Sequence, residues 1–150
     1  MKTIEDIIRE HRFFAGMAPK QLQFIAGCAS NVTFEAGETI FHGGENADHF
    51  YIIRHGVVTV EARDAARGSF PIQTIVENDV LGWSWLFPPY RWNFDARAVT
   101  LVRATAFDGK CLRDKCESDH DLGYELMLRF AGIMMERLQA TRMQVMDVYH

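Results

Sequence analysis

Short apolar runs separated by glycines fill residues 32–60, and they constrain the fold more than any other feature of the chain. The separating glycines are Gly37, Gly43, Gly44 and Gly56. Because glycine adopts positive φ readily, this pattern is typical of β-branched and aromatic strands joined by tight turns. A polar break at residues 64–69 predicts a further hairpin loop, and strand-like sequence resumes at residues 72–76 and 96–107. We therefore expect a β-barrel over residues 32–108.

Helical sequence flanks this region on both sides, which predicts a mainly β fold with flanking α-helices, in one domain spanning residues 1–150. Residues 1–31 are expected to be helical, with a cap at Thr3 and a proline suited to a first helical turn at Pro19. Residues 109–150 contain a long apolar stripe, which exceeds what the barrel alone would cover. This favours a homodimer through the C-terminal helix, and the alternative is that the helix folds back over the barrel. The expected seam residues are Leu126, Phe130, Ile133, Met134 and Leu138.

Composition argues against several classes of function. The formal net charge is -4, whereas a nucleic-acid backbone requires a cationic surface. Three cysteines without a CxxC motif predict reduced thiols in a cytoplasmic protein, and the absence of an 18-residue apolar run predicts no membrane span. The histidines have no metal-ligand spacing, and neither a nucleophile elbow nor a phosphate-binding loop is present. We expect no metal site, no required cofactor and no enzymatic activity.

Three stretches carry a resemblance to a known family. Residues 37–60 read GETIFHGGENADHFYIIRHGVVTV and are similar to the first half of cyclic-nucleotide-binding domains. Residues 75–82 read IVENDVLG and resemble the family's Gly-Asp turn, with Asn78 in the glycine position. Residues 137–145 read RLQATRMQV and look like the long helix of the catabolite-activator-like (Crp/Fnr) branch. The resemblance implies a jelly roll, or double-stranded β-helix, in a ligand-sensing regulatory protein.

The same branch carries a winged helix-turn-helix after its long helix. The sequence ends at His150 without such a module, so we expect no direct DNA binding. In the family, the long helix also contacts the nucleotide base. The resemblance places those contacts at Thr141 and Arg142.

The family's phosphate-binding cassette is the part that this chain alters most. In the family, a short helix offers its amides to the cyclic phosphate, a Glu accepts a bond from the ribose, and an Arg pairs with the phosphate. Residues 82–98 read GWSWLFPPYRWNFDARA, in which Gly82 is retained, Trp83 stands in the Glu position and Trp92 in the Arg position. Loss of both polar groups predicts that cAMP is not bound in the usual way. Arg91 is one residue away and is a candidate substitute for the arginine, although a one-residue slip turns a side chain to the opposite face.

Three tryptophans within ten residues allow three interpretations. They fill the vacated pocket as core, they form an aromatic cage for another ligand, or they form a patch that contacts a protein. We therefore expect a stand-alone sensor or regulatory domain with a small-molecule or protein partner. The alternatives are an adaptor with a filled pocket, and a true cAMP or cGMP sensor that uses Arg91 and the cassette amides. The expected ligand-binding residues are Gly82, Trp83, Ser84, Trp85, Arg91, Trp92, Thr141 and Arg142.

Overall fold

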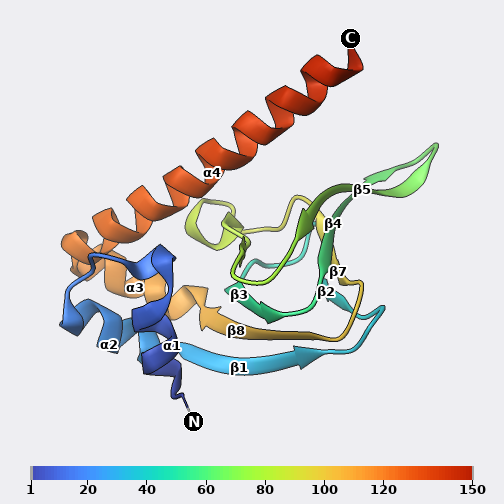
Figure 1. Cartoon of the computed structure of the whole chain (residues 1–150). Helices are drawn as coiled ribbons and strands as arrows, with labels where there is room; N and C mark the ends of the chain where they lie inside the picture. Colours follow the sequence, from blue (N-terminus) through green and yellow to red (C-terminus); the bar gives the residue numbers. More distant parts are fainter. Residues whose placement is uncertain (1, 150) are drawn as a thin grey trace.

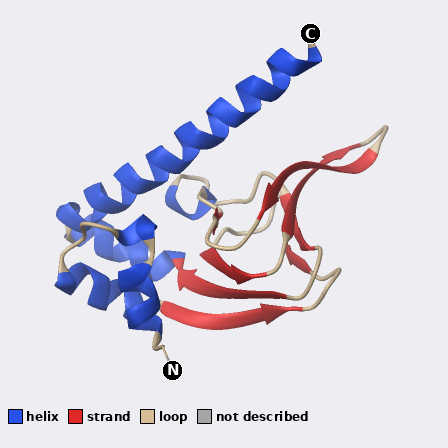
Figure 2. Cartoon of the chain, in the orientation of Figure 1, coloured by secondary structure: helices blue, strands red, loops and turns tan. Residues whose placement is uncertain are grey.

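A computed structural model describes residues 2–149 and contains two four-stranded antiparallel sheets with helices gathered at one end (Figures 1 and 2). The elements in chain order are α1 (Ile4–Glu10), η1 (Arg12–Phe14), α2 (Pro19–Gly27), β1 (Ala29–Phe34), β2 (Thr39–Phe41), β3 (His49–His55), β4 (Val58–Asp64), β5 (Gly68–Ile75), β6 (Val80–Leu81), η2 (Ser84–Leu86), β7 (Asp95–Ala98), β8 (Val102–Asp108), α3 (Gly109–Ser118) and α4 (His120–Val148). This architecture confirms the predicted jelly roll with flanking helices.

The strand orders are β1-β8-β3-β6 in one sheet and β2-β7-β4-β5 in the other. Strand β3 lies between β8 and β6, and its residues Phe50 to Ile53 are all buried. The turn from β3 to β4 depends on Gly56, which has a φ of +98°. A Cβ at that position would lie 2.2 Å from the carbonyl oxygen of Leu101, so the turn has room only for glycine.

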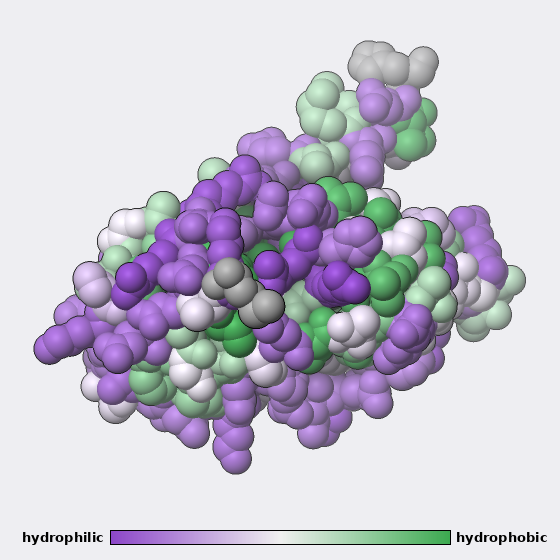
Figure 3. Space-filling model, turned by 60° about the horizontal axis from the view of Figure 1, so that its bottom comes forward, coloured by the Kyte–Doolittle hydropathy of each residue, from purple (hydrophilic) through white to green (hydrophobic). Residues whose placement is uncertain are grey.

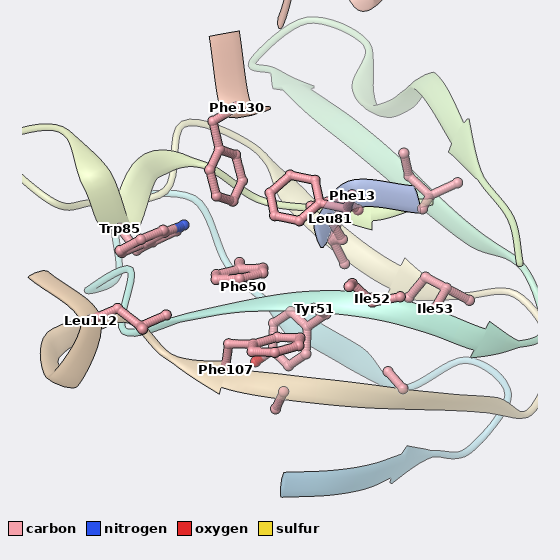
Figure 4. Packing of buried hydrophobic residues seen from close by; sticks show 14 of the residues in the cluster. Phe13, Phe50, Tyr51, Ile52, Ile53, Leu81, Trp85, Phe107, Leu112 and Phe130 are labelled. Atoms are coloured by element: carbon pink, nitrogen blue, oxygen red, sulfur yellow. The ribbon is translucent and has the colours of Figure 1, made fainter. Parts of the chain in front are cut away.

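An aromatic cluster joins the barrel to the helices (Figure 4). The ring of Phe50 stacks on Phe107 at a centroid distance of 4.4 Å and on Trp85 at 5.3 Å. Phe130 from α4 approaches Phe50 edge-on at 5.1 Å. Such geometries suit the quadrupoles of aromatic rings, and they anchor the first half of α4 to the end of the barrel.

The predicted boundary is correct for the start of the C-terminal helices and differs by three residues for the start of the first strand. Helix α3 begins at Gly109, where the C-terminal helices were predicted to begin, and Thr3 and Asp6 form the capping box that starts α1. Strand β1 begins at Ala29, three residues before the predicted boundary at residue 32. Ala29 pairs with Phe107 of β8, so tertiary pairing, and not local sequence, sets the start of this strand.

Helix α4 has 29 residues and is therefore about 44 Å long at 1.5 Å per residue. Its first half packs on the barrel, and its second half projects away from it (Figure 1). Leu126 and Phe130 are fully buried within their own chain, which contradicts their predicted place in a dimer seam. Ile133 and Met134 are half-buried against the same core, and Leu138 is 50% exposed. The first half of α4 therefore folds back over the barrel, as in the alternative interpretation, and of the expected seam residues only Leu138 remains exposed.

Candidate functional site

The cassette segment follows β6 and turns sharply at Gly82, whose φ is +95°. Residues Ser84–Leu86 form a single 3-10 turn, and the amide of Leu86 donates to the carbonyl oxygen of Trp83 at 3.0 Å. The cassette helix is thus much shortened, and the segment returns to the barrel through Trp92.

Trp92 is wedged between the barrel and the cassette. Its ring stacks on Phe41 with the centroids 3.7 Å apart and the planes 7° from parallel, and only 6% of the residue is exposed. A Cβ added to Gly82 would lie 2.7 Å from the edge of this ring. Two backbone hydrogen bonds fix the residue, one from its amide to Glu45 at 3.0 Å and one from the amide of Gly44 to its carbonyl at 2.7 Å. The indole therefore fills the space between Phe41 and Gly82.

Trp83 has a different environment, because it is only half-buried and faces helix α4. The guanidinium of Arg137 lies over its ring, 5.0 Å from the centroid, and also donates to the carbonyl oxygen of Val80. Burial lowers the pKa of Arg137, and the neighbouring Asp79 acts in the opposite direction. Because arginine stays protonated in proteins, this is a partly desolvated positive charge beside an aromatic face.

A cavity of about 100 Å³ remains between the barrel, the cassette and α4. Its lining residues are Phe41, Val60, Ile72, Gln73, Leu81, Gly82, Trp83, Ser84, Trp92, Asn93, Phe94 and Arg137. A closed cavity of about 150 Å³ holds one benzene molecule, and pockets for drug-sized ligands measure about 300–1,000 Å³. The remaining space is accordingly smaller than either of these.

A second cavity of about 410 Å³ lies on the other side of Arg137 and Gln73, which line both. It is bounded by η1, the β5–β6 turn and α4. His11 closes one side: its Nδ1 accepts from the amide of Phe13 at 3.0 Å, and its Nε2 lies 2.8 Å from the carbonyl oxygen of Asn78. Burial lowers the pKa of His11, in keeping with a neutral ring that donates from Nε2. Of the two side chains that line both cavities, Arg137 carries a positive charge and Gln73 is neutral.

The structure brings together four of the predicted ligand-binding residues and places the others elsewhere. Those that line the smaller cavity are Gly82, Trp83, Ser84 and Trp92. Trp85 is fully buried in the aromatic core, and its indole nitrogen has no hydrogen-bond partner among residues 2–149. Its prediction as a ligand contact is therefore contradicted by its packing against Phe50 and Phe130.

Arg91 lies outside both cavities. Its side chain is exposed and donates to the carbonyl oxygen of Gly44 at 2.9 Å, while its backbone forms a bridge with Asn46. Because neighbouring side chains of extended chain point to opposite faces, Arg91 points away when Trp92 points inward.

Thr141 and Arg142 are exposed on the second half of α4, and neither lines a cavity. The hydroxyl of Thr141 donates to the carbonyl oxygen of Arg137 one turn earlier. Sequence reasoning missed Arg137 itself. The signal that could have found it is its position four residues before Thr141, since residues four apart share a helix face.

Two other kinds of feature do not occur in the part of the chain that the structure describes. Within residues 2–149, no helix is long and apolar enough to cross a membrane. Over the same residues, no group of three or more His, Cys, Asp or Glu side chains is placed to hold a metal ion.

Comparison with known proteins identifies the fold and the family. A crystal structure from Geobacter metallireducens GS-15, provisionally assigned as a cyclic nucleotide-binding protein, superposes with a TM-score of 0.82 at 29% identity, covering 92% of this chain and 99% of that one. The sensor domain of the transcriptional regulator DNR from Pseudomonas aeruginosa has the same fold, with a TM-score of 0.72 at 18% identity over 90% of this chain and 91% of that one.

A curated relative, the CRP-like cAMP-activated global transcriptional regulator of Mycobacterium tuberculosis, is 27% identical over 146 residues. The match covers 97% of this chain and 63% of the regulator. The family model for the cyclic nucleotide-binding domain matches residues 31–119, which is more than half of the chain. This chain therefore belongs to the cyclic nucleotide-binding domain family.

Proposed function

We propose that this chain is a ligand-sensing regulatory domain that does not hold cAMP through the Glu–Arg pair of its family. The observation that carries the proposal is the position of Trp92, stacked on Phe41 at 3.7 Å and packed against Gly82. An indole in this place removes both the phosphate-binding charge and much of the space for the nucleotide. The relatives are regulators, which favours a regulatory role over an enzymatic one.

The chemistry of the remaining site favours a small ligand with a flat part and a negative charge. Arg137 is the one cationic side chain lining the smaller cavity within residues 2–149, and Trp83 offers it an aromatic face at 5.0 Å. An anionic group bound to Arg137 would sit at the boundary of the two cavities. The ring of such a ligand would lie against Trp83 and would require this half-buried side chain to turn aside, because the cavity of about 100 Å³ is smaller than the space that one benzene molecule takes.

A homodimer through α4 is the second part of the proposal. Residues on the exposed face of α4, all but one of them apolar, recur at alternating spacings of four and three, which is the pattern of a coiled-coil seam. The residues at these positions are Tyr124, Leu128, Ala131, Met135, Leu138, Arg142 and Val145. All of them are exposed in the single chain. Hydrophobic residues are visible among hydrophilic ones along the projecting end of α4 (Figure 3). Exposed apolar surface on a projecting helix favours a partner helix, because an isolated helical end has little stability in water.

An adaptor that only contacts a protein is the competing function. It is favoured by the apolar surface at the mouth of the smaller cavity, where Phe94 is 44% and Ile72 38% exposed. The third alternative, cAMP or cGMP binding through Arg91, lacks geometric support because Arg91 points away from the cavity.

Thermal unfolding against a ligand panel tests the proposed function. The probes are cAMP, cGMP, inorganic phosphate, benzoate and indole-3-acetate, each at millimolar concentration. We expect no shift in Tm with either cyclic nucleotide and a rise with an aromatic carboxylate. A ligand at 100 times its Kd adds about 2.7 kcal/mol, which corresponds to about 5–10 °C for a chain of this size.

Two arginine variants separate site binding from general charge effects. Arg137→Gln should abolish the shift, whereas Arg54→Gln, which removes an exposed charge at the end of β3 outside both cavities, should retain it. A clear Tm rise with cAMP in the unmodified protein would overturn the proposal. No response to any probe would favour the adaptor.

A further inference from the structure

Two cysteines that are 83 residues apart in the sequence meet where the N-terminal helices join the barrel. Cys28 follows the last residue of α2, and Cys111 lies in the first turn of α3. Their sulfur atoms are 2.6 Å apart, and both side chains are half-buried. A disulfide bond of about 2.05 Å would require the two sulfurs to approach by only about 0.5 Å.

Asp108 holds the backbone of both cysteines through two hydrogen bonds. The amide of Asp108 donates to the carbonyl oxygen of Cys28 at 2.9 Å, and a carboxylate oxygen of Asp108 accepts from the amide of Cys111 at 3.0 Å. The adjoining residues Ala29 and Phe107 are paired in the sheet. The two thiols are therefore held together by the fold and do not meet by chance fluctuation of loops.

We propose that Cys28 and Cys111 form a reversible dithiol–disulfide pair that is oxidised by a peroxide. The Cys111 sulfur attacks one oxygen of the peroxide, the O–O bond breaks, and a sulfenic acid and one water are formed. The Cys28 sulfur then displaces the hydroxyl group as a second water, and the S–S bond closes. Overall, two thiols and one hydrogen peroxide give one disulfide and two waters, and the protein loses two electrons.

The surroundings assign the roles of the two thiols. Burial and the contact with the Cys111 sulfur raise the pKa of Cys28 to about 12, so the Cys28 thiol keeps its proton. We assign Cys28, the protonated thiol, as the resolving group, and Cys111, in the first turn of α3, as the attacking one. The third cysteine, Cys116, is not in contact with this pair, and burial raises its pKa as well.

The bond would connect the N-terminal helices to the cassette through α3. Arg113 of α3 donates to the carbonyl oxygen of Trp85 at 2.7 Å, at the end of the altered cassette. At the start of α3, a Cβ added to Gly109 would lie 2.9 Å from the Cβ of Trp85, so the two segments are in close contact. Oxidation would fix α3, and with it the cassette, relative to α2 and β1.

Thiol counting and peptide mapping test the proposal on the whole chain. Reduced protein treated with a small excess of hydrogen peroxide should lose two of its three thiols, and its mass should fall by two hydrogen atoms. The peptide map should contain the peptides of Cys28 and Cys111 joined by a disulfide bond, and the mass should be that of a single chain. The closed loop should raise Tm by roughly 5–15 °C, and dithiothreitol should reverse the change.

Cysteine variants provide matched controls. Cys28→Ser and Cys111→Ser should each lose the Tm rise, while Cys116→Ser should keep both the link and the rise. Retention of three thiols after treatment, a link that includes Cys116, or a link between two chains would each overturn the proposal. If a serine variant does not fold, the thiol count and the peptide map of the unmodified protein decide between these outcomes.

Discussion

Replacement of Trp92 by alanine should lower the free energy of unfolding by about 3–5 kcal/mol. The side chain is 6% exposed, stacks on Phe41 and contacts Gly82, so its removal leaves a cavity and ends an aromatic stack. Urea unfolding monitored by circular dichroism measures the change. A loss of this size means that the indole is part of the core and not one wall of an open cage.

Trp83→Ala is the control for this experiment. Trp83 is half-buried and makes one cation–π contact, with Arg137, so we expect a cost of about 0.5–2 kcal/mol. Equal small costs for the two variants would contradict the account, because they would show that Trp92 contributes little to packing. The aromatic cage would then be the better interpretation.

A charge in the proposed seam should convert the dimer into a monomer. Leu138 is 50% exposed in the single chain and occupies a seam position of α4. In a dimer, Leu138→Asp would bury two carboxylates against each other. The free energy required to bury these charges is far larger than the stabilisation from one apolar seam contact. Sedimentation velocity at micromolar concentration should show about twice the 17.2 kDa chain mass before the substitution and the single mass after it.

Gln144→Asp adds the same charge to an exposed position of α4 away from the seam and should leave the dimer intact. A wild-type protein that sediments as a monomer would refute the proposed seam. So would a Leu138→Asp variant that remains dimeric.

The barrel could be predicted because its signals are local. Glycines at turns such as Gly56 and a buried run such as Phe50 to Ile53 specify strands and their connections within a few residues. The family resemblance depends on the same positions. The start of β1 at Ala29 was missed because it depends on pairing with Phe107, far along the chain.

The site could be predicted only in part, because its geometry depends on distant packing. The sequence places Trp92 at the arginine position, but its stack on Phe41 follows from the way β2 and β7 pair. The same limit applies to the two other tryptophans, since the turn at Ser84–Leu86 directs Trp85 into the core and leaves Trp83 near α4.

Helix α4 illustrates why an apolar stripe alone does not assign a surface. The helix has two apolar faces, one with Leu126 and Phe130 against the barrel and one with Met135 and Leu138 toward solvent. Both have helical spacing, so the sequence does not distinguish them. The rotation of α4 about its own axis determines which face packs against the barrel, and it also brings Arg137 over Trp83.

The most direct test of the central claim is calorimetric titration of cAMP into the unmodified protein and into the Trp83→Glu/Trp92→Arg double variant, after circular dichroism has shown that the variant is folded. We expect no binding by the unmodified protein at about millimolar cAMP, which corresponds to a binding free energy weaker than about −4 kcal/mol. We expect measurable binding by the variant, in which the cassette Glu and Arg are restored. Binding by the unmodified protein with a Kd of about 10 μM or less would contradict the claim that tryptophans have closed the nucleotide site.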